Sequence, residues 1–392
     1  LEFGPLVQER MYEIGGEKAL AGFTGTQEIV PIQEMGPQGR AHMGYGHPGF
    51  WMLPMKNTRD RATAMMPALL AERMEEFGLD YCVMYPTGGF ATAMQNDDEV
   101  RTAACRAFNI FSAEYFADYA DLMTPVAVIP MHTPDEAIEE IAYVRESLEL
   151  KACLFSGMVP RSVPAAKEGD PKAHRLGSIT YDVFGIDSPY DYDPVWEACL
   201  EYGVSPTFHS GGRGYALRRS PTNFTYNHIG HFASTAEALC KAMFLGGVTR
   251  RFPQLRMAFL EGGTAWACQL YADLIEHWEK RNRTALDYND PANLDHNLMI
   301  DLATEFGARG MAEMMVERDH ALFAALNTAA STNDGGQAEL DDYAPCEIET
   351  EEDIADLFVP NFYFGCVADD RLNATAFNTA VNPMGARLNA LF

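Results

Sequence analysis

The sequence predicts an α/β fold of the (β/α)8 TIM-like barrel type, in which helices surround a parallel sheet. Short apolar runs alternate along the chain with amphipathic helical patterns, as is typical of parallel strands that are buried on both faces. No G-x-G-x-x-G turn follows any of these runs, which disfavours the alternative of an open doubly wound sheet.

Seven apolar runs are strand candidates, and most of them end in Gly, Pro or a polar residue. They are 79-LDYCVMYPT, 125-PVAVIPM, 150-LKACLFSG, 204-VSPTFHSGG, 255-LRMAFLEGG, 362-FYFGCVADD and 387-RLNALF. Because this barrel type has eight strands, we expect the first strand and the end of the last strand to lie outside the given chain.

Helical patterns occupy the intervals between these runs. They cover residues 59–78, 134–149, 231–247 and 264–281. The second pattern begins with Pro134 and two acidic residues, which favours a helix start there.

Three regions are expected along the chain. Residues 1–57 are rich in Gly and Pro and predict an irregular N-terminal arm near the barrel mouth, and residues 58–392 predict the barrel domain. The interval around 283–360 is longer than one helix needs and contains the acidic stretch 332-TNDGGQAELDDYAPCEIETEED, which indicates an insertion.

Composition narrows the choice of partners. The chain has 29 Lys and Arg against 56 Asp and Glu, a net charge of −27, which repels nucleic acid and anionic membrane surfaces. The alternative is that this negative charge serves only to keep a cytosolic protein soluble. The eight cysteines are scattered without a C-x-x-C pair, which favours reduced thiols and a cytoplasmic location. No run has membrane-spanning length, and no signal-peptide pattern opens the chain.

Polar residues stand at the carboxyl ends of the predicted strands, where barrels of this type carry their chemistry. These residues are Thr87, His132, Ser156, His209, Glu261, and Asp369 with Asp370. Imidazoles and carboxylates gathered on one rim indicate an acid–base site or a site for a divalent metal.

His209 and Glu261 are the leading candidates. Each ends an apolar run and is followed by glycines, as in 204-VSPTFHSGG and 255-LRMAFLEGG. A carboxylate at the end of a core strand is costly unless it is paired or binds a cation. The alternative for Glu261 is a cap on the amides of residues 262–264 at the start of the next helix.

Three further residues are candidates with open alternatives. His228 and His231 lie one helical turn apart, so that one of them could act as a general base; the alternative is that both are surface residues. Arg213 could bind a substrate carboxylate through its planar guanidinium, or it could serve as a salt-bridge partner.

The segment 245-LGGVTRRFPQLRMAFLEGGTAW resembles a characteristic block of the amidohydrolase-2 family, metal-dependent TIM-barrel hydrolases and decarboxylases related to aminocarboxymuconate-semialdehyde decarboxylase. The resemblance extends to residues 73–87, 201–212 and 362–370 and covers about 60–392. It implies one divalent metal ion, Zn or Mn, and places His209 at the family's metal-binding histidine of strand 5.

The chain also departs from the family pattern. Glu261 stands in an EGG turn where many members have HGG, and the Asp/Glu-x-His pair of strand 1 and the G-S-D motif of strand 8 are absent from the 392 residues. The resemblance therefore implies either a fragment of a longer protein or a form that cannot hold the metal in the family manner.

Four functional hypotheses follow. The first is a metal-dependent hydrolase that acts through metal-activated water on a small carboxylic-acid or ring-derived substrate, with catalytic Glu261, His228, His231 and Asp369, substrate-binding Arg213 and metal-binding His209. The others are a non-oxidative decarboxylase of an aromatic acid, a catalytically inactive barrel or subunit, and a metal-free hydrolase that uses Glu261 and Asp369. The apolar helix expected at 264–278 would offer an interface for a homo-oligomer.

Overall fold

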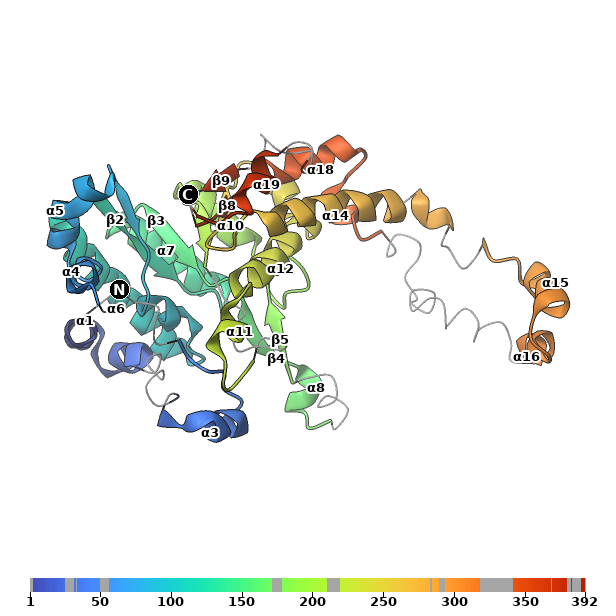
Figure 1. Cartoon of the computed structure of the whole chain (residues 1–392), viewed down its shortest axis with the longest axis horizontal. Helices are drawn as coiled ribbons and strands as arrows, with labels where there is room; N and C mark the ends of the chain where they lie inside the picture. The colour runs from blue at the N-terminus through green and yellow to red at the C-terminus, as the bar shows by residue number, and fades with distance from the viewer. Residues whose placement is uncertain are drawn as a thin grey trace. The chain divides into compact units, whose positions relative to one another are not determined.

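The computed structural model forms two compact units, one of residues Leu1–Cys268 with Leu357–Phe392 and one of residues Gln269–Asp356. Figure 1 shows the elements of the chain. The structure describes residues 3–24, 32, 34–49, 56–170, 178–209, 219–282, 284–288, 293–317, 341–367, 369–378, 382 and 389–391.

A sheet of seven parallel strands forms the centre of the first unit. Its strands are β1 (Cys82–Met84), β2 (Met123–Ile129), β3 (Ala152–Phe155), β6 (Pro206–Phe208), β7 (Met257–Phe259), β8 (Phe362–Gly365) and β9 (Asn389–Leu391). These strands fall on the seven predicted runs. They lie side by side in chain order, without the reversal of a doubly wound sheet, so the α/β fold of the TIM-like barrel type is confirmed.

A row of four phenylalanines fixes the register of the central strands. Phe155 of β3 is paired with Phe208 of β6, which is paired with Phe259 of β7, which in turn is paired with Phe364 of β8. All four rings are almost fully buried, and the rings of neighbouring strands lie 5.6 to 6.2 Å apart. Because a slip of one residue would turn these rings to the other face, the row sets the level at which each strand ends.

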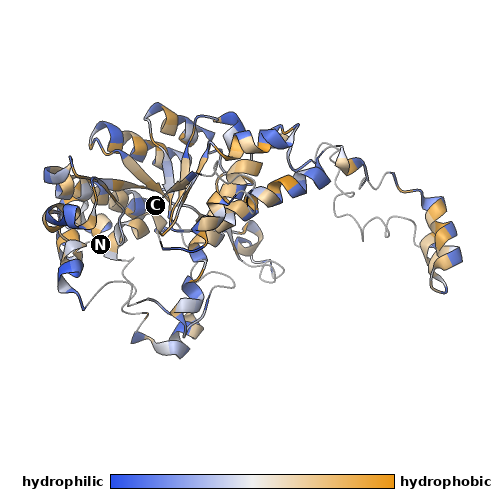
Figure 2. Ribbon diagram, turned by 45° about the horizontal axis from the view of Figure 1, so that its top comes forward, coloured by the Kyte–Doolittle hydropathy of each residue, from blue (hydrophilic) through white to orange (hydrophobic). Residues whose placement is uncertain are grey.

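Helices follow the strands through most of the first unit. They include α6 (Asp98–Phe116), α7 (Pro134–Glu146), α10 (Asp193–Glu201), α11 (Phe224–His228), α12 (His231–Leu245), α13 (Val248–Arg251) and α19 (Asn373–Phe377). Helices α14 (Ala265–Arg281) and α18 (Glu351–Phe358) each belong partly to the first unit and partly to the second. The helices predicted at 134–149, 231–247 and 264–281 are confirmed as α7, α12 and α14. Figure 2 shows apolar residues concentrated in the sheet and on the helix faces that cover it.

The single helix expected over 59–78 is two helices. They are α4 (Thr58–Thr63) and α5 (Pro67–Phe77), and Pro67 stands in the first turn of α5. Because proline has no N–H to donate and clashes with the preceding turn, a helix that reaches it ends there and a new one begins.

An antiparallel hairpin follows β3 and was not expected from the sequence. It consists of β4 (Val159–Ser162) and β5 (Ile179–Asp182), and the short helix α8 (Pro164–Lys167) lies between them in the chain. Most of its residues are exposed or half-buried, so the hairpin lacks the apolar run that marks the other strands.

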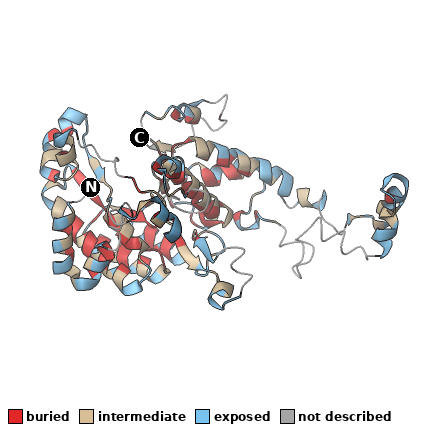
Figure 3. Ribbon diagram, turned by 60° about the horizontal axis from the view of Figure 1, so that its bottom comes forward, coloured by how far each residue is buried: buried red, intermediate tan, exposed pale blue. Residues whose placement is uncertain are grey.

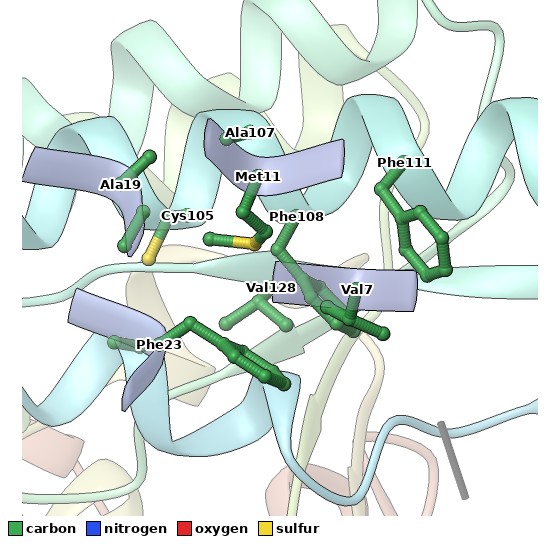
Figure 4. Packing of buried hydrophobic residues seen from close by; sticks show 11 residues of the cluster. Val7, Met11, Ala19, Phe23, Cys105, Ala107, Phe108, Phe111 and Val128 are labelled. Atoms are coloured by element: carbon green, nitrogen blue, oxygen red, sulfur yellow. The ribbon is translucent and has the colours of Figure 1, made fainter. Parts of the chain in front are cut away.

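The N-terminal arm, expected to be irregular, is largely helical where it is described. It contains α1 (Gly4–Thr24) and α3 (Gly36–Met43). Gly22 serves close packing, because a Cβ there would lie 2.4 Å from Ala104 Cβ of α6, whereas Gly16, with a φ of +66°, kinks α1. Figure 4 shows the resulting core, in which Val7, Met11 and Phe23 of α1 meet Phe108 of α6.

The second unit contains the remaining described helices. Besides parts of α14 and α18, these are α15 (His296–Phe306) and α16 (Met311–Glu317). The acidic stretch 332–353 lies partly within 318–340, outside the described residues. The division into arm, barrel and insertion stays a prediction. Figure 3 shows the burial of each element, and among the described helices none combines the length and hydropathy of a membrane span.

Helix α7 begins with a capping box that offers a test of local stability. Glu136 N donates to Thr133 Oγ1 at 3.3 Å, and Thr133 N donates to the Glu136 side chain at 2.8 Å. We expect Thr133→Ala to lower the free energy of unfolding by about 1 kcal/mol, because a helix amide loses its acceptor. Urea denaturation measures this change. Thr102→Ala, at an exposed position of α6, is the control, and an equal effect there would contradict the capping role.

Candidate active site

His209 and Glu261 meet at the carboxyl ends of two neighbouring strands. His209 follows Phe208, the last residue of β6, and Glu261 stands two residues after Phe259, the last residue of β7. Because these phenylalanines are paired, the residues that follow them emerge at the same level of the sheet. His209 Nε2 lies 2.9 Å from Glu261 Oε2, which is a hydrogen bond between imidazole and carboxylate.

The backbone at Glu261 adopts an unfavourable conformation. Its φ is +57°, in the left-handed region that non-glycine residues rarely occupy. The turn is held on both sides, since Leu260 N donates to Phe208 O at 2.9 Å and Gly263 N donates to Gly365 O at 3.1 Å. Backbone strain of this kind persists where the surrounding structure enforces it, and it is common at functional sites.

The Glu261 carboxylate is directed to His209. Among the hydrogen bonds of the described residues, none joins this carboxylate to the amides of 262–264, so the structure gives no support to the helix-cap alternative. The His209 and Glu261 side chains are 27% and 46% exposed, respectively, and are therefore within reach of a small molecule.

Electrostatics keep Glu261 ionised. The hydrogen bond from His209 lowers the pKa of Glu261 below its ordinary value, and the nearby imidazoles of His228 and His231 act in the same direction, while burial opposes them. The ionised carboxylate is therefore an acceptor for the N–H of the neighbouring imidazole.

The lowered pKa predicts how this hydrogen bond contributes to stability. A depressed pKa in the folded state gives stabilisation that is full above the ordinary Glu pKa of 4.5 and is lost as the pH falls through the lowered value. The difference in melting temperature between the wild type and Glu261→Gln should therefore shrink as the pH is lowered from about 7 to about 2. Thermal unfolding over that range measures it, and a constant difference would contradict the prediction.

Three rings of helices α11 and α12 lie beside this pair. His228 ends α11, His231 begins α12, and their ring centroids are 4.6 Å apart. The Phe232 and His209 rings are steeply inclined, with centroids 4.5 Å apart, and the centroid of Phe232 lies 3.8 Å from that of His231. The structure thus brings His228 and His231 into the neighbourhood of His209 and Glu261, and their catalytic role stays a prediction.

Of the two acids after β8, Asp370 is the one that lies against the Glu261 turn. A Cβ placed on Gly263 would be 2.9 Å from Asp370 Oδ2, whereas Asp369 is exposed. The catalytic role of Asp369 stays a prediction. No sequence pattern separates adjacent aspartates, because the choice depends on the turn that follows the strand.

The other strand ends are engaged elsewhere or fall outside the described residues. Arg213 lies in 210–218, which the structure does not describe. The buried Ser156 hydroxyl donates to Met158 O at 3.1 Å. Burial, with Arg101 and Arg161 nearby, lowers the pKa of His132 to about 3, so this imidazole is neutral.

The described residues do not make a complete metal site. Within the described ranges, no group of three or more His, Cys, Asp and Glu side chains is arranged to hold a metal ion. His209 and Glu261 supply two donors, whereas zinc sites normally take three or four protein ligands.

A parallel sheet in chain order, with an imidazole–carboxylate pair at its strand ends, is the arrangement of an α/β barrel that carries a site at the carboxyl ends of its strands. The model of the amidohydrolase family matches residues 41–309. The chain belongs to this family, whose members are metal-dependent enzymes that use a divalent ion such as Zn or Mn. Among curated proteins, no relative matches the chain.

Solved structures of low similarity include three bacterial proteins. A dihydroxybenzoic acid decarboxylase from Polaromonas sp. JS666, with bound manganese and 2-nitroresorcinol, has 15% identity and a TM-score of 0.48, covering 86% of this chain and 79% of its own. A 5-carboxyvanillate decarboxylase from Novosphingobium aromaticivorans DSM 12444, complexed with manganese and 4-hydroxy-3-methoxy-5-nitrobenzoic acid, has 16% identity and a TM-score of 0.45, covering 64% and 67%. An amidohydrolase from Mycobacterium avium subsp. paratuberculosis K-10 has 18% identity and a TM-score of 0.43, covering 75% and 72%.

Proposed function

We propose that the protein is a hydrolase of the amidohydrolase type that acts on a small carboxylic-acid or ring-derived substrate, with His209 and Glu261 as its acid–base pair. The contact of 2.9 Å between His209 Nε2 and Glu261 Oε2, at the exposed ends of adjacent strands, carries the proposal. Family membership supports hydrolase and decarboxylase chemistry equally.

The roles of the two residues follow from their hydrogen bond. With Nε2–H of His209 donating to the ionised Glu261 carboxylate, the other ring nitrogen, Nδ1, is the proton acceptor. In hydrolysis, Nδ1 takes a proton from the attacking water, and Glu261 stabilises the imidazolium that results. The imidazolium then gives this proton to the leaving group. No step of this scheme runs through a metal ion. The described residues supply two donors, His209 and Glu261, which is fewer than the three or four protein ligands of a usual zinc site.

Product analysis tests the proposal. Purified protein, with and without added Zn²⁺ or Mn²⁺, is incubated with ring lactones, cyclic amides and hydroxybenzoic acids, and hydrolysis of the ester or amide bond and release of CO₂ are followed separately. Cleavage with ¹⁸O incorporation from labelled water is the expected result. Release of CO₂ without such incorporation would replace the hydrolase by a decarboxylase, and no turnover of any compound would favour the inactive barrel.

The proposal also includes the location, the partners and the oligomeric state of the protein. All eight cysteines are free thiols, which supports a reducing, cytoplasmic compartment. A small-molecule substrate, with no nucleic acid or membrane partner, is consistent with the net charge of −27. Homo-oligomerisation through the helix at 264–278 stays part of the proposal, and the mass of the native protein tests it.

A further inference from the structure

The side chain of Asn227 is a buried junction between helix α11 and the chain that precedes it. Asn227 is 0% exposed. Its Oδ1 accepts from Ser220 N at 2.6 Å, and its Nδ2 donates to Ser220 O at 2.9 Å and to His47 O at 3.4 Å. One amide side chain therefore binds both backbone polar groups of Ser220 and reaches the N-terminal arm.

The arm is bound to the same place by further hydrogen bonds. The buried Arg40 donates from Nε to Pro221 O at 2.8 Å, and His47 N donates to Ser220 O at 2.7 Å. These partners are far apart in the sequence, so the contacts are tertiary and attach residues 40–49, which we call the strap, to residues 219–221.

From the strap, a continuous series of ring contacts leads to the active-site histidine. Gly49 is packed so closely on Phe224 that a Cβ there would lie 2.6 Å from the ring. The Phe224 ring is 5.0 Å from His228, which is 4.6 Å from His231. The series ends at Phe232, whose ring centroid lies 4.5 Å from that of His209.

We propose that the strap positions the ring layer of α11 and α12 against His209, with Asn227 as its buried positioning residue. The proposal rests on the proposed function, in which His209 is the base. Asparagine suits this position because its amide offers an acceptor for Ser220 N and donors for two carbonyls, whereas aspartate has no donor. Gly49 suits the strap because any side chain there would collide with the Phe224 ring.

Two variants test the proposal from opposite ends. Asn227→Ala removes three hydrogen bonds, and Gly49→Ala removes none but displaces the Phe224 ring. Proton–carbon NMR spectra of histidine-labelled protein at one fixed pH report the imidazoles, and single His→Gln variants assign them. We expect both variants to shift the signals of His228 and His209 and to lower turnover by up to about 100-fold, the cost of misplacing a catalytic group by about 1 Å.

Asn361→Ala is the matched control. Asn361 is 1% exposed and donates to Leu255 O at 2.8 Å, but it precedes β8 and so lies at the opposite end of the strands. This variant should lose stability and leave the imidazole signals of His209 and His228 unchanged. If Asn227→Ala fails to fold, Gly49→Ala gives the same readout without loss of a hydrogen bond.

Unchanged His228 and His209 signals in Gly49→Ala would overturn the proposal that the strap positions these rings. The failure of the proposed function looks different, because His209→Asn would then retain turnover while the ring shifts in the strap variants persisted.

Discussion

Glu261→Gln will lower turnover by about 10²- to 10⁴-fold and leave the fold intact. The glutamine amide still fits beside His209 but carries no charge, so it cannot stabilise the imidazolium that forms when His209 takes a proton. Steady-state kinetics on the substrate found by product analysis give the loss, which we expect in kcat rather than in KM.

Two matched variants isolate the role of the Glu261 charge. Glu237→Gln removes a carboxylate from the α12 surface, where it pairs with Lys241, and should leave turnover unchanged. The double variant of Glu261→Gln with His209→Asn should lose little more than His209→Asn alone, because the two residues act as a unit. Full turnover in Glu261→Gln would contradict the acid–base assignment.

Glu261→Gly separates catalysis from stability. Glycine adopts the φ of +57° without strain, which offsets the greater entropy that it gives the unfolded chain. We expect the free energy of unfolding to change by about 1 kcal/mol or less while turnover is lost. Such a result would show that the carboxylate is kept in a strained turn for its chemistry.

Much of this fold follows from the sequence because parallel strands buried on both faces are continuous apolar runs. The strand ends are readable for the same reason: residues directly after two neighbouring strands emerge side by side. This is why His209 and Glu261 are expected from the sequence on one rim of the barrel, and the row containing Phe208 and Phe259 is the physical cause of their common level.

The features missed by the sequence analysis depend on contacts between distant segments. The glycine content of the N-terminal arm predicts irregular structure, yet Gly22 lies in helix α1 and lets this helix approach Ala104 closely. The hairpin β4–β5 has no apolar run because both of its strands are largely exposed or half-buried. Likewise, the position of His228 beside the site is tied to Asn227 and to the arm, and neither local propensity nor periodicity encodes that junction.

Arg101→Met will lower the free energy of unfolding by about 3 to 5 kcal/mol. Arg101 on α6 is 0% exposed and donates from Nε and Nη2 to Glu136 Oε2 at 2.9 and 2.7 Å, and from Nη1 to Gln95 O at 2.8 Å. Methionine fills much of the space but leaves the Glu136 side chain, which is 8% exposed, as a buried charge that has lost its cation. Urea denaturation gives the loss.

Two comparisons distinguish this buried ion pair from an ordinary one. Lys241→Ala breaks the half-exposed pair with Glu237 and should cost no more than about 1 kcal/mol. Adding Glu136→Gln to Arg101→Met should restore part of the stability, because the uncompensated charge disappears. The loss of Arg101 should also raise the pKa of His132, which this guanidinium helps to hold down, and NMR titration detects that shift. A cost in Arg101→Met as small as that in Lys241→Ala would mean that Glu136 finds another partner, and the ion pair would then not be what secures α6 to α7.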